Sequence, residues 1–117
     1  MTAALRNRAV TINILQEFSK TPGGRYYTDG PASGQKFREE FLLPALAAND
    51  RVIVEMDGTR GYPSSFLEEA FGGLVRELKW TPEEFHRRIE LKASADFAVY
   101  VSDVEIHVRK ASNGGRR

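Results

Sequence analysis

The stretch that decides the fold is "RVIVEMDGTRGYPSSFLEEAFGGLVREL", residues 51–78. Its first part, residues 51–58, is dense in β-branched side chains and ends at a glycine, which predicts a central, largely buried strand. From Leu67 onward, apolar side chains recur every three or four positions, as they do on one face of a helix. These side chains are Leu67, Ala70, Phe71, Leu74, Val75 and Leu78. A buried strand that leads into an amphipathic helix is typical of an α/β fold.

Upstream of this stretch, the pattern predicts two strands and a helix. Residues 10–18 alternate apolar and polar side chains, which predicts a first strand. Residues 25–28 lie between two turn clusters and fit a short second strand, paired with the first as a hairpin. Residues 34–48 repeat apolar side chains at helical spacing, with Ser33 as the N-cap. Pro44 lacks a backbone donor, so we expect it to kink or shorten that helix.

Downstream, a helix, a short strand and a last ambiguous segment follow. Thr81, Pro82 and Glu84 form the capping-box pattern that opens a helix. Residues 89–92 fit a short strand. Residues 94–111 match both a helical face and the alternation of a strand, and they are rich in β-branched side chains. We favour a helix there because the helical repeat extends further.

The predicted order of elements is therefore β-β-α-β-α-α-β-α. Strands separated by helices indicate a mixed, mostly parallel β-sheet with helices packed on it. The 117 residues suit a single domain. We assign residues 1–111 to that domain and residues 112–117, "SNGGRR", to a flexible tail.

Composition and charge exclude several classes of function. The formal net charge is +1, so the overall field does not favour nucleic acid as a partner. The longest apolar run, "FLLPALAA", is far shorter than the roughly 20 residues that span a bilayer, which predicts no membrane partner. The chain has no cysteine, which fits a cytoplasmic location. The two histidines lack the spacing of a metal site and no phosphate-binding loop is present, so we predict neither a metal nor another cofactor.

Ser64 and Ser65 stand at the start of the predicted helix and allow two interpretations. A serine there can cap the helix by accepting a hydrogen bond from a free backbone N–H group. Alternatively, an exposed serine at that end of a helix can accept phosphate, which adds about −1.5 to −2 charges. We expect Ser64 to be exposed, because Pro63 holds the loop extended, and Ser65 to have the more structural role.

The same residues carry a family resemblance. "VIVEMDGTRGYPSSFLEEAFGGLV" (52–75), with "SGQKFREEFLLPAL" (33–46) upstream, resembles the STAS domains of anti-sigma-factor antagonists. The sequence is closer still to the bacterial STAS-like domains of unknown function. This resemblance implies an α/β sandwich that acts as a switch between proteins. The serine that a partner kinase phosphorylates in the antagonists corresponds to Ser64. Pro63 and Phe66 stand where those proteins have aspartate and glycine.

Two functions follow as hypotheses. The first is a non-enzymatic regulatory module that binds a protein, either a kinase-like ATPase or another signalling protein, and is switched at Ser64. Its expected partner-binding residues are Asp57, Tyr62, Ser64, Ser65, Phe66, Glu68 and Glu69. For Tyr62 and Phe66 two alternatives stay open, an exposed contact or an inward-facing staple. The second function is a small enzyme or nucleotide-binding protein that uses Glu55, Asp57 and the serine loop. We favour the first, since no set of nucleophile, base and orienting group is recognisable.

Overall fold

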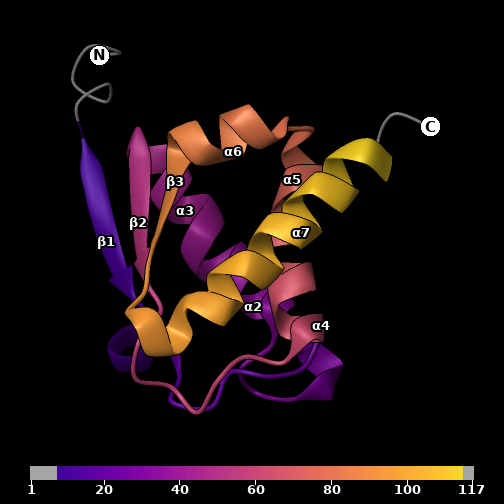
Figure 1. Ribbon diagram of the computed structural model, residues 1–117. Helices are drawn as coiled ribbons and strands as arrows, with labels where there is room; N and C mark the ends of the chain where they lie inside the picture. The colour runs from indigo at the N-terminus through magenta and orange to yellow at the C-terminus, as the bar shows by residue number, and fades with distance from the viewer. Residues whose placement is uncertain (1–7, 115–117) are drawn as a thin grey trace.

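The computed structural model describes residues 8–114, which form a three-stranded parallel sheet with helices between and after the strands (Figure 1). The strands are β1 (Ala9–Asn13), β2 (Arg51–Glu55) and β3 (Ile89–Lys92), and their order in the sheet is β1-β2-β3. The predicted α/β class and the central position of β2 are thus confirmed. The register pairs Val52 with Val10 on one side and with Ile89 on the other.

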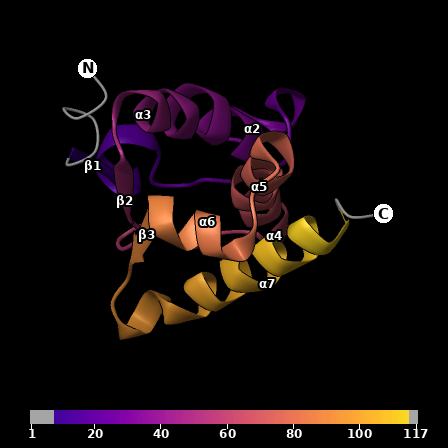
Figure 2. The ribbon, with the colours of Figure 1, turned by 90° about the horizontal axis from the view of Figure 1, so that it is seen from above.

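The helices lie on one side of the sheet, as the view from above shows (Figure 2). Ile12, Val52 and Val54 point toward the helices and are buried. Thr11 and Ile53 belong to the opposite face, where Thr11 is exposed and Ile53 is half-buried. The core therefore lies between one face of the sheet and the helical layer, because alternate residues of a strand point to opposite faces.

The predicted second strand at residues 25–28 is wrong. The Asp29 carboxylate accepts hydrogen bonds from the backbone N–H groups of Arg25 and Tyr26, at 3.1 and 2.8 Å, and closes this segment into a turn. A short 3-10 helix, η2 (Tyr27–Asp29), follows directly. β1 therefore has no hairpin partner here, and it pairs in parallel with β2 instead.

The first strand is shorter than the predicted range of 10–18. The Asn13 side chain accepts a hydrogen bond from the Gln16 backbone N–H at 3.0 Å, which caps the next turn. That turn is a π-helix, η1 (Ile14–Phe18). The alternating pattern slips at Leu15, at the point where the strand gives way to a helical turn.

The helix predicted over residues 34–48 is present as α2 (Gly34–Phe37), a π-helical turn η3 (Arg38–Leu42) and α3 (Leu43–Ala48). Ser33 caps it as predicted, because its Oγ accepts a hydrogen bond from the Lys36 N–H at 3.1 Å. Pro44 does not end the helix. Pro44 has no backbone N–H to donate, but it lies in the first turn of α3, directly after the π-helical turn η3. The chain stays helical to Ala48.

The motif helix comprises α4 (Ser64–Leu67), the π-helical turn η4 (Glu68–Gly72) and α5 (Gly73–Leu78). Its predicted apolar stripe is confirmed: Leu67, Phe71 and Leu74 are fully buried, and Leu78 is partly buried against the core. The helix ends at Lys79, which has left-handed backbone angles with φ of 56°.

The remaining predictions for the second half of the chain are largely confirmed. Thr81 and Glu84 form the predicted capping box of α6 (Pro82–Arg88), and β3 follows at once. After a 3-10 turn, η5 (Ala95–Phe97), the ambiguous segment forms the helix α7 (Ala98–Gly114). α7 runs past the predicted end of the domain at residue 111. The predicted tail therefore begins inside a helix, and its last residues, 115–117, lie outside the described residues.

Candidate functional site

Ser64 is exposed at the first position of α4, as predicted. Pro63 precedes it with extended backbone angles, φ −60° and ψ 147°, and serves as the N-cap residue. The Ser64 Oγ lies 3.1 Å from the Nε2 of His107, which is a hydrogen-bonding distance. The hydroxyl that the motif presents is therefore held by a side chain from another helix.

Neither serine caps the helix, so the capping interpretation does not hold for either of them. Among residues 8–114, no side chain makes a cap hydrogen bond at the start of α4. The first turn is closed instead through the Pro63 carbonyl oxygen, which accepts from the N–H groups of Phe66 and Leu67. Ser65 is half-buried one residue further along the helix. Its expected contribution as a cap, typically about 1 kcal/mol, is therefore absent.

Tyr62 and Phe66, which flank the two serines in the sequence, are buried in the core. Phe66 is fully buried and its ring lies 5.9 Å from that of Tyr62. The Tyr62 hydroxyl donates a hydrogen bond of 2.6 Å to the Met56 carbonyl oxygen. Burial raises the pKa of Tyr62 to about 12. The inward alternative therefore holds, and we correct the prediction that these two side chains contact a partner, because neither reaches the surface.

His107 is the site residue that the sequence pattern does not reveal, because no spacing along the chain links it to Ser64. It lies on α7, whose Val104, Val108 and Ala111 are buried in the core. α7 packs closely on the motif helix, since a methyl group added at Gly72 would lie 3.5 Å from the His107 carbonyl oxygen. Burial lowers the pKa of His107, and Glu68 and Asp103 offset this only in part. The ring is thus uncharged at neutral pH and able to accept a proton.

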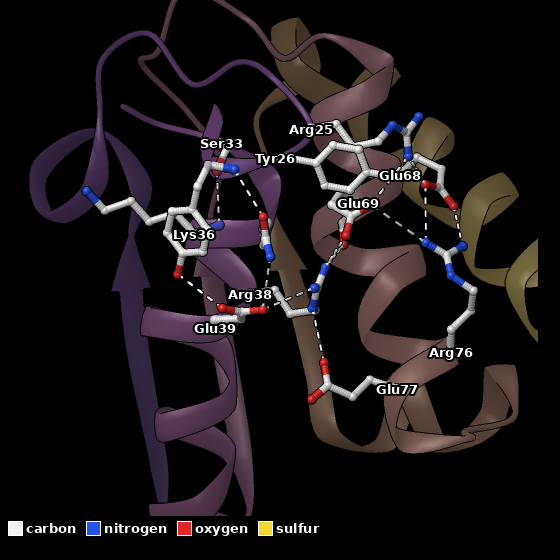
Figure 3. Close-up of polar contacts among 12 residues, drawn as sticks. Arg25, Tyr26, Ser33, Lys36, Arg38, Glu39, Glu68, Glu69, Arg76 and Glu77 are labelled. Atoms are coloured by element: carbon white, nitrogen blue, oxygen red, sulfur yellow. Dashed lines mark hydrogen bonds and ion pairs between the residues drawn. The ribbon is translucent and has the colours of Figure 1, made fainter. Parts of the chain in front are cut away.

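Close to this pair, arginine and glutamate side chains from three segments of the chain form a network of ion pairs (Figure 3). Glu68 follows Ser64 by one helical turn and is ion-paired with both Arg25 and Arg76. Burial would raise the pKa of Glu68, but the hydrogen bonds from Arg76 and Arg25 outweigh it and hold this pKa below its usual range. Glu68 is therefore a carboxylate at neutral pH, with its charge compensated by two guanidinium groups.

The network continues inward to a buried ion pair. Arg38 and Glu69 are each only 8% exposed. The Arg38 Nη1 donates to the Glu69 side chain at 2.8 Å and to the Glu69 backbone carbonyl oxygen at 2.6 Å, while its Nε donates to Glu77 at 3.2 Å (Figure 3). Glu69, which we predicted to bind a partner, is thus engaged inside the domain. Glu68 is half-buried and closer to the surface.

Glu55 and Asp57 belong to a separate region. A hollow of about 540 Å³ lies at the carboxyl ends of β2 and β3. It is lined by Glu55, Asp57, Leu91, Lys92, Ala93 and Ser94. The two carboxylates are held apart by different partners, because Glu55 accepts from the Asn13 side-chain amide at 3.0 Å and Asp57 accepts from the Ser94 backbone N–H at 2.9 Å. Ser64 and Ser65 do not line this hollow, so the structure does not bring together the residues of the enzyme hypothesis.

Neither a metal-binding cluster nor a membrane-spanning helix is present in the described part of the chain. No cluster of three or more histidine, aspartate or glutamate side chains there could hold a metal ion. The His86 Nε2 instead lies 2.9 Å from the Glu105 carboxylate, a contact that joins α6 to α7. Of the helices in residues 8–114, none has the length and apolar character needed to cross a membrane.

Comparison with known proteins identifies the family. A family model described as a STAS-like domain of unknown function matches residues 33–96, which is more than half of the chain. The chain belongs to the STAS-like domains of unknown function. No curated protein and no solved structure matches it. The matched segment of this STAS-like domain includes Ser64 but ends before His107, so the contact between them joins the family motif to a helix beyond the match.

Proposed function

We propose that this STAS-like domain is a non-enzymatic regulatory module that binds a protein partner and is switched by phosphorylation of Ser64. Its role would then be that of an anti-sigma-factor antagonist or a related signalling protein in the bacterial cytoplasm. The partner would be a kinase-like ATPase or another signalling protein. One observation carries the proposal: the exposed Ser64 hydroxyl does not cap its helix and is hydrogen-bonded to an uncharged histidine.

The chemistry of the switch needs a hydroxyl that can lose its proton. When a partner kinase transfers the γ-phosphoryl group of ATP, a bond forms between Oγ and phosphorus, and the bond from phosphorus to the leaving ADP oxygen breaks. The hydroxyl proton must go to a base. The neutral Nε2 of His107 lies 3.1 Å away and can accept it. ATP and the residues that bind it belong to the partner.

The non-enzymatic character is supported by what surrounds the pair. A serine nucleophile needs a base that is in turn oriented by a third group. Within residues 8–114, the His107 ring has its hydrogen bond with Ser64 and with no third side chain. Asp103 and Glu68 act on it through their charge only. The pair therefore fits a residue that is modified by another protein better than a nucleophile that attacks a substrate.

The experiment compares four forms of the tagged chain in the cells from which it comes: wild type, Ser64→Ala, Ser64→Asp and Ser65→Asp. Partners are cross-linked, captured and quantified by mass spectrometry, and circular dichroism verifies that each variant is folded. We expect one partner to be retained by the wild type, Ser64→Ala and Ser65→Asp, and to be lost by Ser64→Asp. The Ser65→Asp variant is the matched control, since it places the same charge one residue along. Equal retention by Ser64→Asp would contradict the proposal.

A further inference from the structure

The contact between Ser64 and His107 also indicates what happens after a phosphate is attached. In the unmodified chain the Ser64 hydroxyl can donate its proton to the uncharged Nε2. A phosphorylated Oγ has no proton to donate, and a phosphate dianion offers only acceptor oxygens. The hydrogen bond can then persist only if the Nε2 carries a proton, as it does in one neutral tautomer and in the imidazolium, and a neighbouring dianion favours the imidazolium.

The charges around His107 can accommodate an added anion. Glu68 from the motif helix and Asp103 from α7 are the carboxylates that act on it, and Lys110 and Arg25 are the cations. Arg76 is ion-paired with Glu68 and adds a third cation. The two arginines also pair with Glu69, so this group of side chains holds three carboxylates and three cations. Glu68 would repel a phosphate one turn away, but its charge is already compensated by the two arginines.

We propose that His107 is an internal phosphate-binding residue, which becomes a charged imidazolium and donates its Nε2–H to a phosphate on Ser64. This inference rests on the proposed function, because it concerns the state that phosphorylation of Ser64 would create. It makes α7 the element that supplies the hydrogen-bond donor to the phosphate. The phosphorylated form keeps α4 and α7 joined, and the switch presents a new charge on an unchanged fold.

The inference has reciprocal consequences for two titrations. A dianion beside His107 favours the protonated ring, so the pKa of His107 rises when Ser64 is phosphorylated. By the same coupling, the imidazolium favours the dianion and lowers the second pKa of the phosphate from its usual value of about 6. Both changes must vanish when either group is removed.

The test uses phosphoserine inserted at position 64 during translation, so that no natural kinase is required. The second pKa of the phosphate is measured by phosphorus NMR, and the same group inserted at position 65 is the matched control. We expect the pKa at position 64 to be lower than that at position 65 by about 1. His107→Gln should abolish the difference. His86→Gln should preserve it, because His86 pairs with Glu105 elsewhere on α7.

A second measurement does not depend on the folding of His107→Gln. Nitrogen NMR of the otherwise unaltered chain follows the titration of the His107 ring, with and without phosphoserine at position 64. A rise in its pKa supports the inference. Identical titration of the two phosphoserines, or of His107 in both forms, would overturn it. Such a result would leave the proposed function intact, since a phosphate can release a partner by repulsion alone. Conversely, if Ser64→Asp fails to release a partner while the inserted phosphate still binds His107, the proposed function fails and the inference stands.

Discussion

The molecule has two polar regions beyond the end of its central strand, and they differ in how they are built. The hollow at Glu55 and Asp57 is made of residues at or just after strand ends, and both carboxylates are engaged in local structural hydrogen bonds. The corner at Ser64 and His107 joins side chains that are 43 positions apart and lies beside a network of ion pairs. Carboxylates at a strand end are therefore a weaker indication of a functional site than a hydroxyl that is hydrogen-bonded to an uncharged base from a remote part of the sequence.

The largest difference between the two regions should appear in stability. Arg38→Met removes the closest partner of Glu69, which is only 8% exposed, and leaves that carboxylate its longer ion pairs with Arg25 and Arg76, at 3.5 and 3.9 Å. Breaking a buried pair typically costs about 3–5 kcal/mol of unfolding free energy, and we expect a loss at the lower end of that range because Glu69 keeps its two longer ion pairs. In the hollow, Glu55→Gln keeps an acceptor for Asn13 and should change stability by no more than about 0.5 kcal/mol. Urea unfolding of both variants measures the contrast.

The double variant Arg38→Met, Glu69→Met is the control for the buried pair. It should be more stable than Arg38→Met alone, because it also removes the buried carboxylate that has lost its closest partner. If the double variant were less stable than the single one, the cost would come from lost packing and not from the buried charge.

The second prediction tests how the motif helix is held in place beneath the Ser64 corner. A methyl group at Gly34 would lie 2.5 Å from the Phe66 carbonyl oxygen and 3.0 Å from the Ala70 backbone nitrogen. Gly34→Ala should therefore force α2 away from the motif helix and cost about 1–3 kcal/mol. Gly23→Ala is the matched control, since its nearest neighbour, the Pro63 side chain, would be at 3.7 Å. Equal melting temperatures for the two variants would show that the crossing is not tight.

The third and smallest effect is the pH dependence that His107 confers. Because burial lowers its pKa in the folded state below the ordinary 6.5, the unfolded chain binds the proton more tightly. The contribution of His107 to stability is therefore complete above about pH 6.5 and declines as the pH falls through that value toward the folded-state pKa. Unfolding free energies measured from pH 7.5 to pH 5 should fall more steeply for the wild type than for His107→Gln. Parallel curves would mean that the ring is not desolvated.

The sequence pattern predicted the elements whose structure depends mainly on the spacing of their own apolar residues. The stripe from Leu67 to Leu78 fixes a helix because its spacing is unambiguous over three turns. Residues 25–28 were misjudged because a single carboxylate, Asp29, closes them into a turn and outweighs their preference for a strand. Short segments depend on such individual hydrogen bonds, which a residue pattern does not reveal.

The candidate site was predictable only in part. The exposure of Ser64 followed from its place after Pro63 at the start of a helix. Its contact with His107 could not follow, because it depends on how α7 packs on the motif helix and involves no spacing along the sequence. The burial of Phe66 and Tyr62 also depends on tertiary packing, since both lie beside the apolar stripe and not within it.

The most direct test of the central claim is to map phosphate on the chain isolated from its own cells. Peptides that span residues 61–76 are analysed by mass spectrometry after growth under several conditions, with phosphatases inhibited during isolation. The fragmentation pattern distinguishes Ser64 from the adjacent Ser65. The exposed Ser64, held by His107, is predicted to carry the phosphate, and Ser64→Ala is predicted to abolish it without transferring it to Ser65. Phosphate found on Ser65 and absent from Ser64, or a chain unmodified under every condition, would contradict the claim.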